Sequence, residues 1–318
     1  MAHQTLLFLV GPTASGKTTV GIEVALRIGA EILSLDSMSL YRGMDIGTAK
    51  PTPAERDRVP HHLVDIADPH EAFSTGRYLA AAEAAIADVV ARGKRPLFVG
   101  GTALYLKAFT EGFFDGPSAD WALRNRLIAE AEEHGLPALH ERLKAVDPAA
   151  AARIHPNDLR RIVRALEVLE VTGRPISEQQ TQWGQAPQVG RLCHLVGLRR
   201  GRKELCERIS RRVDAMFAAG LVDEVRRLLR GTHSASNVSP GISHAAAQFV
   251  GYREVIAHLR GELTLDEAVE NVKARTRQFA KRQMTWFRSF PQIRWVDADV
   301  ASTAVGLAAQ VVEAFGLH

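Results

Sequence analysis

Short apolar runs alternate with longer amphipathic segments over the first hundred residues of the chain. The runs have the length and composition of buried strands, whereas the segments between them repeat apolar residues at helical spacing. Strands separated by helices predict a parallel sheet with right-handed crossovers, whose ligands bind beyond the carboxyl ends of the strands. We predict strands at residues 6–10, 31–35, 62–66 and 96–99, and helices at residues 17–28 and 78–91.

The pattern changes near residue 112. From there most apolar residues recur at helical spacing, which predicts a mainly helical segment before the sheet resumes at residues 193–198. The stretch 232–243 is rich in Ser, Pro and Gly and predicts a mobile loop, although its sequence indicates no role. The helices expected in this half are 121–134, 137–146, 158–171 ended by Gly173, and two amphipathic helices ended by Gly220 and Gly231.

The first strand runs directly into a glycine-rich loop that ends at Lys17 and Thr18, where the first helix begins. Such a loop wraps backbone N–H groups around a chain of phosphates, and the helix adds the positive end of its dipole. We expect Lys17 to contact the terminal phosphate and Thr18 to be a ligand of Mg²⁺. A glycine-rich turn without a ligand is the alternative, and the motif does not indicate which di- or triphosphate binds. The predicted phosphate-binding residues are Gly11, Pro12, Thr13, Ala14, Ser15, Gly16, Lys17 and Thr18.

Together these elements predict an α/β protein. Its main part is a P-loop-type parallel sheet flanked by helices, which we assign to residues 1–114 and 191–318. A mainly helical insertion domain occupies residues 115–190.

The composition is that of an ordinary globular protein, with 46% hydrophobic and 24% charged residues. No apolar run is long enough to cross a bilayer, and the chain enters its first strand without a leader, so we expect a cytoplasmic protein without a membrane partner. We also expect a monomer, although the sequence does not determine the oligomeric state. Cys193 and Cys206 are too few for a disulfide framework or a cysteine-rich zinc site. The net charge is only +4, but the arginines concentrate after residue 150, which indicates a polyanionic partner.

Two further polar groups follow predicted strands directly. Asp36 comes after the second strand, where a carboxylate could act as a general base, hold Mg²⁺ through water, orient the loop, or cap a helix. Thr102 follows Gly100 and Gly101 after a later strand, where its hydroxyl and N–H could contact a ligand or cap a helix. Because the carboxyl ends of parallel strands share one edge of the sheet, both residues are expected near the phosphate loop.

Two predicted helices carry clusters of basic residues. The first has Arg160, Arg161 and Arg164 in its opening turns, where positive charge opposes the helix dipole. The second spans residues 273–288, and its basic positions, which include Lys281 and Arg282, are interleaved with aromatic residues. Basic and aromatic groups together are typical of nucleic-acid surfaces. A solvated face, an acidic neighbour for the arginines and a core position for the aromatics are the alternatives.

These motifs together resemble the tRNA dimethylallyltransferases, which prenylate adenosine next to the anticodon of tRNA. The resemblance extends over nearly the whole chain, and its 47–51 and 281–287 motifs are far more specific than a phosphate loop. The motifs are the loop 11–18, Asp36-Ser-Met, Gly47-Thr-Ala-Lys-Pro51, Val99-Gly-Gly-Thr102, the segment 153–164, Arg208-Ile-x-x-Arg212, Gly251-Tyr-Arg253 and Lys281-Arg-Gln-x-Thr-Trp-Phe287.

The resemblance implies a role for each part of the predicted site. Lys17, Thr18 and Arg212 would stabilise the departing pyrophosphate of dimethylallyl diphosphate together with Mg²⁺. Asp36 would take a proton from the adenine N6 amine, and Thr102 would hydrogen-bond near the base, which leaves its stack in the anticodon loop. The tRNA-contacting residues, with Lys281 and Arg282 from the basic cluster, are Asp36, Ser37, Met38, Ser39, Thr102, Arg124, Arg160, Arg161, Ile162, Val163, Arg164, Gln248, Gly251, Tyr252, Arg253, Lys281 and Arg282.

Two departures from the family pattern and three alternatives remain. The family sometimes has a basic residue at Gln248, and the zinc-finger extension of eukaryotic members is missing, which indicates a bacterial-type enzyme without zinc. A phosphate-loop kinase of small metabolites leaves the basic second half unexplained. Prenylation of free adenine nucleotides needs no RNA surface, and a non-catalytic RNA-binding protein leaves Asp36 and Thr102 without a task.

Overall fold

The computed structural model describes residues 5–114, 116–117, 119–180, 192–231, 233–234, 237–238 and 241–317. The chain divides into two compact units. The first consists of Met1–Leu106 and Gly190–His318, and the second of Lys107–Val189. The division falls within helix α4 (Ala103–Glu111).

The first unit is built on a parallel sheet of six strands in the order β3-β2-β4-β1-β5-β8. Strand β1 lies between β4 and β5, so that the ends of β2, β4 and β1 are neighbours along one edge. The α/β fold class predicted from the periodicity is confirmed. The strands are β1 (Thr5–Val10), β2 (Ala30–Leu35), β3 (His61–His62), β4 (Arg95–Gly100), β5 (Leu192–Arg200) and β8 (Arg294–Ala298).

One predicted strand is wrong in extent. The run 62–66 is apolar enough for a strand, but β3 ends at His62. The next residue, Leu63, has a left-handed backbone with φ of 61°, and Asp65 has φ of 58°. Backbone of this hand cannot continue a strand, so the chain turns away from the sheet.

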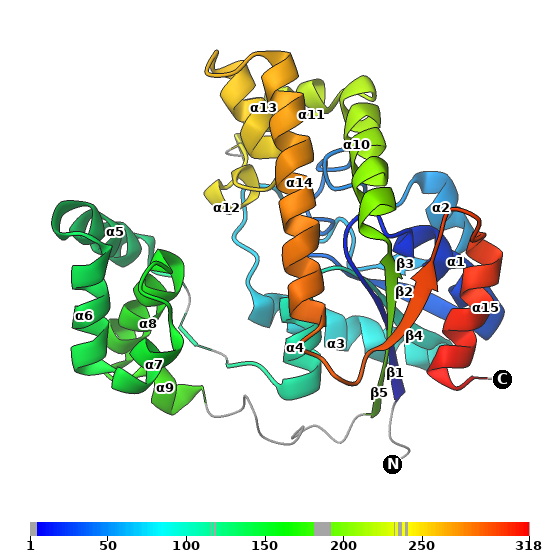
Figure 1. Cartoon of the computed structure of the whole chain (residues 1–318), viewed down its shortest axis with the longest axis horizontal. Helices are drawn as coiled ribbons and strands as arrows, with labels where there is room; N and C mark the ends of the chain where they lie inside the picture. The colour runs from blue at the N-terminus through cyan, green and yellow to red at the C-terminus, as the bar shows by residue number, and fades with distance from the viewer. Residues whose placement is uncertain are drawn as a thin grey trace. The chain divides into compact units, whose positions relative to one another are not determined.

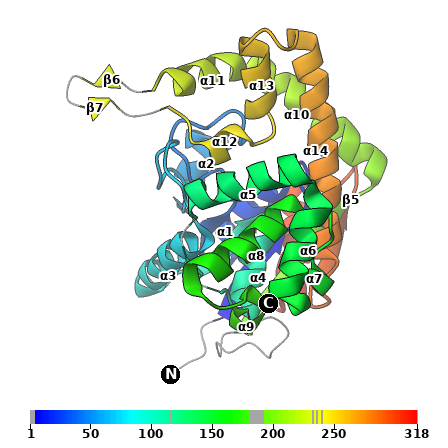
Figure 2. The same cartoon turned by 90° about the vertical axis from the view of Figure 1, so that its left-hand side faces the viewer.

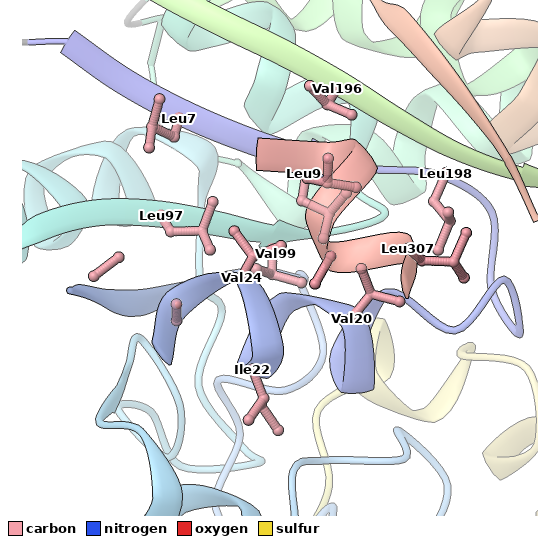
Figure 3. Close-up of a cluster of buried hydrophobic side chains, with 14 of the residues drawn as sticks. Leu7, Leu9, Val20, Ile22, Val24, Leu97, Val99, Val196, Leu198 and Leu307 are labelled. Carbon is pink, nitrogen blue, oxygen red and sulfur yellow. The ribbon is translucent and has the colours of Figure 1, made fainter. Parts of the chain in front are cut away.

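Helices α1 (Lys17–Ile28) and α15 (Ala304–Phe315) cover one face of the sheet (Figure 1). Alternate residues of the strands, such as Leu7, Leu9 and Leu97, pack beneath them with Val20 and Leu307 from the two helices (Figure 3). The intervening residues point to the other face, where α3 (Thr75–Ala91) lies and Phe8 stacks on Phe98 with ring centroids 4.7 Å apart. The near-continuous apolar strands are what a sheet covered on both faces requires.

A second group of helices follows β5 beyond the carboxyl end of that strand (Figures 1 and 2). The longest, α14, opens with a reciprocal capping box between Thr264 and Glu267, and β8 then returns along the sheet. Ile209, Val213, Val272 and Ala280 pack against Ala14 of the phosphate loop, so this group supports the loop from outside the sheet. These helices are α10 (Arg202–Ala218), α11 (Leu221–Arg230), α12 (His244–Ala247), α13 (Tyr252–Leu259) and α14 (Leu265–Phe287), and the remaining short helix of the unit is α2 (Pro53–Arg58).

The second unit is helical, and its buried cluster includes Leu127, Leu139, Leu143, Ile162 and Leu166. Its three longer helices agree with the predicted spans to within a residue or so. Two shorter helices were not predicted, because their four to six residues are too few to show a periodicity. The helices are α5 (Trp121–His134), α6 (Leu136–Val146), α7 (Pro148–Arg153), α8 (Leu159–Thr172) and α9 (Ile176–Gln179).

The predicted mobile loop at 232–243 is only partly described. Strands β6 (His233–Ser234) and β7 (Asn237–Val238) pair antiparallel there (Figure 2). Residues 232, 235, 236, 239 and 240 lie outside the described residues, so the prediction is not tested. Among the helices of the described residues, none has both the length and the apolar character needed to span a membrane.

Candidate active site

One cavity in the first unit collects polar groups from the ends of three neighbouring strands. The phosphate loop after β1 contributes Thr13, Lys17 and Thr18, and the end of β2 contributes Asp36. Gly100 and Gly101 line the same cavity from the end of β4, and Arg212 reaches it from α10. The sequence argument that placed these groups on one edge of the sheet is therefore consistent with the structure.

The phosphate loop is held in shape by arginines that are distant in sequence. Arg208 donates from Nε to the carbonyl oxygen of Ala14 at 2.9 Å, and Arg200 donates to that of Ser15 at 2.9 Å. Arg212 contacts the Thr13 hydroxyl at 3.3 Å. These pairs are separated by 185 to 199 residues, so β5 and α10 fix the loop only once the chain has folded.

The cations of the site are poorly hydrated and close to one another. Burial and the neighbouring Arg212 guanidinium lower the pKa of Lys17 to about 7, against the opposing pull of the Asp36 carboxylate. Burial also lowers the pKa of Arg212. The Lys17 ammonium donates to the carbonyl oxygen of Pro12 at 2.7 Å. A polyanion bound here would offset the cost of burying these cations and the repulsion between them.

Asp36 and Thr102 are brought together by the turn that follows β2. Oδ1 of Asp36 accepts hydrogen bonds from the backbone N–H of Met38 at 2.8 Å and of Ser39 at 3.4 Å. The Thr102 hydroxyl accepts from the N–H of Ser37 at 3.1 Å. Residues 37–40 form a bend and a turn rather than a helix, so Asp36 is not a helix cap. Its second carboxylate oxygen has no hydrogen-bond donor among the described residues.

Residues 47–51, at the end of the segment from Tyr41 to Pro51, form another wall of the cavity. Lys50 is its anchor, with only 2% of its side chain exposed. Its ammonium donates to the carbonyl oxygen of Tyr41 at 2.7 Å and to the carboxylates of Asp45 and Asp65. A buried ammonium with three acceptors is fully satisfied, so Lys50 is a structural residue of this wall rather than a free cation for a ligand.

Glu224 on α11 also holds the segment from Tyr41 to Pro51. Oε2 accepts from the N–H of Asp45 at 2.9 Å and of Ile46 at 2.7 Å, and Oε1 accepts from the N–H of Gly47 at 3.1 Å. The Tyr252 hydroxyl also donates to Oε1 at 2.7 Å. A Cβ on Gly47 would lie 2.5 Å from the Tyr252 ring, so only glycine fits there. The sequence does not reveal this contact, because Gly47 and Glu224 are 177 residues apart.

One part of the cavity wall is apolar. Val213 and Met216 of α10 face it together with Val272 and Phe279 of α14. Phe279 meets the ring of Phe249 edge-on, with centroids 6.4 Å apart. The cavity therefore combines a cationic end at the strand termini with an apolar wall, which suits a ligand that has one anionic and one apolar end.

The second basic cluster separates into surface and core. Lys281 and Arg282 are exposed on α14, and Gln248 and Arg253 are exposed near α13. Among the aromatic residues of α14, Phe287 is fully buried, half-buried Phe279 lines the cavity, and Trp286 is exposed on the surface. Tyr252, predicted to contact tRNA, is also fully buried. The Tyr252 hydroxyl donates to Glu224, so the Tyr252 side chain is not available to tRNA. The tRNA contacts predicted for this segment are therefore left to exposed side chains such as Gln248 and Arg253.

The arginines of the helical unit also differ from one another. Glu167, with no exposed side-chain surface, binds Arg124 through two hydrogen bonds of 2.8 and 2.9 Å and Arg164 through one of 2.6 Å. Burial opposes its ionisation, but hydrogen bonds from these arginines hold the pKa of Glu167 below its ordinary value. Arg160 and Arg161 are exposed, whereas Ile162 and Val163 lie in the core. The acidic neighbour left open by the sequence is therefore real for Arg164, and the side chains of Ile162 and Val163 are not available to tRNA.

Comparisons with known proteins agree over nearly the whole chain. The family model described as IPP transferase matches residues 39–290, and that described as isopentenyl transferase matches residues 4–66. A tRNA dimethylallyltransferase of Syntrophobacter fumaroxidans is 50% identical, covering 96% of this chain and 86% of its own length. One from Symbiobacterium thermophilum is 52% identical, covering 92% and 89%.

Solved structures show the same likeness. The full-length tRNA isopentenylpyrophosphate transferase of Bacillus halodurans is 38% identical, with a TM-score of 0.67 over 98% of this chain and 97% of its own. A eukaryotic dimethylallyltransferase, described as acting on tRNA, is 29% identical, with a TM-score of 0.77 over 96% of this chain and 77% of its own.

The Glu224 network predicts a measurable stability cost. Glu224→Gln keeps the size of the side chain but turns one acceptor oxygen into a donor that faces N–H or O–H groups. We expect a loss of roughly 2–3 kcal/mol in unfolding free energy, because buried donors lose their acceptor. Thermal unfolding followed by calorimetry measures it. Asp223→Asn, on the exposed face of the same helix, is the control, and an equal melting temperature for both variants would contradict the assigned role of Glu224.

Proposed function

Because the chain belongs to the tRNA dimethylallyltransferase family, we propose that the cavity at the strand ends is its active site. The enzyme transfers a dimethylallyl group to the N6 amine of adenosine 37 of tRNA. The observation that carries the proposal is the meeting of Lys17, Arg212 and Asp36 in one cavity that also has an apolar wall. A diphosphate with a five-carbon apolar tail matches both ends of that cavity.

The diphosphate would lie against the loop Gly11–Thr18. Backbone N–H groups of this loop and the first turn of α1 face an anion at that position. Lys17 and Arg212 would neutralise the negative charge that grows on the pyrophosphate as it leaves. The lowered pKa values of both groups in the free protein fit this role, because a bound diphosphate would offset the burial of both and the repulsion of Lys17 by Arg212.

Mg²⁺ fits the oxygen donors of the same cavity. The Thr18 hydroxyl would be its protein ligand, with the Asp36 carboxylate in the same cavity. Within the described residues no group of three or more His, Cys, Asp or Glu side chains could hold a metal ion. The diphosphate and water would therefore complete its coordination, and when bound the ion would add positive charge beside the leaving group.

The transfer itself is a substitution at the allylic carbon. The N6 nitrogen of adenine forms a bond to C1 of the dimethylallyl group while the bond from C1 to the diphosphate oxygen breaks. The electron pair of the broken bond leaves with pyrophosphate, which Lys17 and Arg212 stabilise. Asp36 takes the proton that N6 loses, so that positive charge does not build up on the nitrogen. Thr102, joined to the Asp36 turn through Ser37, would hydrogen-bond beside the base.

The tRNA would be held by exposed basic side chains in each unit. Arg160 and Arg161 in the helical unit, and Arg253, Lys281 and Arg282 in the sheet unit, are the exposed candidates for phosphate contacts. Arg124 and Arg164 are bound to Glu167, which supports a structural role for these two arginines. The backbone N–H groups of Ser37, Met38, Ser39 and Gly251 already donate to Thr102, Asp36 and Glu254, so backbone contacts from these residues to tRNA would use their carbonyl oxygens.

Product analysis tests the function as a whole. The protein is incubated with unmodified tRNA, Mg²⁺ and either dimethylallyl diphosphate or ATP, and the tRNA is digested to nucleosides for mass spectrometry. We expect dimethylallylated adenosine and free pyrophosphate with dimethylallyl diphosphate only. Phosphate transfer from ATP, or prenylation of free AMP at the same rate as tRNA, would overturn the proposal.

Asp36→Asn keeps the size of the side chain and the oxygen that accepts from Met38, but it cannot accept the proton. General-base removal typically costs about 10²–10⁴-fold in rate, and we expect a loss in that range at saturating substrates. Single-turnover transfer measures it, with Asp57→Asn on the exposed surface of α2 as the control. A near-normal rate would eliminate Asp36 as the base, and a selective loss of diphosphate and Mg²⁺ affinity would favour a metal role.

Lys17→Ala should lower transfer and leave tRNA binding nearly unchanged, because Lys17 lies in the phosphate loop and not on a basic surface. Losing one charge-assisted contact to the leaving group costs on the order of 3 kcal/mol in the barrier. Transfer kinetics and filter binding of tRNA separate the two effects. Lys94→Ala, exposed directly before β4, is the control. Equal losses of rate and tRNA affinity would contradict this division of roles.

Arg160→Ala should weaken tRNA binding, whereas Arg164→Ala should lower the stability of the protein. Removing exposed Arg160 should weaken binding of all tRNAs and reduce the salt dependence of the affinity by about one unit. Removing Arg164 leaves Glu167 with one fewer donor, so the melting temperature should fall instead. Filter binding over a salt series, combined with thermal unfolding, checks both. A lower melting temperature for Arg160→Ala with an unchanged salt slope would show that Arg160 is structural too.

A further inference from the structure

Gln283 of α14 connects the two parts of the site that bind different substrates. We propose that it is a positioning residue: it fixes the phosphate loop relative to the end of β4, and so fixes the allylic carbon relative to the adenine amine. This inference rests on the proposed function for the identity of the two substrates. It rests on the contacts of Gln283 alone for the link between the loop and the strand.

Both ends of the Gln283 amide are engaged. Oε1 accepts from the backbone N–H of Thr13 in the phosphate loop at 2.8 Å. Nε2 donates to the carbonyl oxygen of Gly101, directly before Thr102, at 2.9 Å. Thr13 follows β1 and Gly101 follows β4, and these are neighbouring strands. One side chain therefore ties together the termini of the strands that carry the diphosphate site and Thr102.

The surroundings of Gln283 leave its amide little freedom. The residue is 8% exposed and lines the cavity. Ala280 and Phe287, three residues before and four residues after it, are buried on the same face of α14. A Cβ on Gly101 would lie 2.4 Å from Nε2 of Gln283, so the strand end and the amide are in direct contact. The glycine at this position is what allows the amide to approach.

Only a glutamine supplies both interactions at this reach. Glutamate could accept from Thr13 but would face the Gly101 carbonyl with a second acceptor oxygen. Methionine has a similar length and shape but offers neither interaction. The loop would then keep its contacts to Arg200, Arg208 and Arg212 and lose its direct link to β4. Displacement of reacting groups by about 1 Å can cost on the order of 10²-fold in rate.

The first test compares Gln283→Met and Gln283→Glu with Gln278→Ala, an exposed glutamine on the same helix. We expect both Gln283 variants to lower the single-turnover rate about 10- to 100-fold at saturating substrates. Affinity for tRNA should change by less than twofold, because the residue does not lie on the outer surface. Gln278→Ala should match the wild type. A normal rate in Gln283→Met, or a lower melting temperature with a normal rate, would overturn the inference and leave a purely structural residue.

A second test uses the contact with Gly101. Gly101→Ala must displace the Gln283 amide and should lower the rate about as much as Gln283→Ala does. In the Gln283→Ala background there is no amide to displace, so adding Gly101→Ala should cost less than about threefold. Independent, multiplicative losses would show that the two residues do not act through one contact. This cycle also replaces the first test if Gln283→Met does not fold.

A binding readout separates failure of the inference from failure of the proposed function. Titration with inorganic pyrophosphate and Mg²⁺ needs no transfer activity, and we expect about five- to tenfold weaker binding in Gln283→Met because the loop loses its anchor to β4. If the wild type forms no prenylated tRNA but this difference is found, the proposed function fails and the positioning role stands. If the wild type is active and neither pyrophosphate affinity nor rate depends on Gln283, the positioning role fails alone.

Discussion

A site for a polyanion must hold several positive charges where little water can reach them. The contacts that support the phosphate loop in the sheet unit serve this requirement. Burial lowers the pKa of both Lys17 and Arg212, and nearby guanidinium groups add to the effect, that of Arg212 on Lys17 and that of Arg208 on Arg212. The phosphate loop is held by Arg200 and Arg208 through its carbonyl oxygens, by Gln283 through an N–H, and by the helix core through Ala14.

Two buried glutamates hold other segments of the chain in place. Glu224 accepts three backbone N–H groups and the Tyr252 hydroxyl, and so holds the segment from Tyr41 to Pro51, whose end forms a wall of the cavity. Glu167 accepts from Arg124, Arg164 and the N–H of Asp120, and so joins α5 to α8 in the helical unit. A carboxylate has room for about four donors, which makes it an efficient buried hub when all of them are present. The position of Glu167 also explains why Arg160 and Arg164, which lie in the same cluster, differ: Arg164 is bound to Glu167, whereas Arg160 is exposed.

The phosphate loop alone is compatible with kinases as well as transferases, and the apolar wall narrows the choice. The polar ribose and the polar base edges of a nucleotide would find no hydrogen-bond partner on the apolar wall, which consists of Val213, Met216, Val272 and Phe279. These side chains suit a short hydrocarbon attached to a diphosphate. Membership of the tRNA dimethylallyltransferase family confirms the activity predicted from the sequence motifs and removes the metabolite kinase as an alternative.

The sequence by itself determined what depends on neighbours along the chain: the strands and longer helices, the phosphate loop, the carboxylate and hydroxyl at the next strand ends, and the family. These features are local, because periodicity, capping and loop chemistry need only a few consecutive residues. The tertiary structure alone decided that Gln283 spans two strand ends, that Glu224 shapes the wall, and that Arg160 is exposed while Arg164 is bound to Glu167. Most of these roles depend on partners far away in sequence, and all of them depend on burial. Neither a contact with a distant residue nor the burial of a single polar side chain produces a periodic pattern in the sequence. Residues of the same type therefore cannot be told apart from the sequence, and their different roles become visible only in the packed structure.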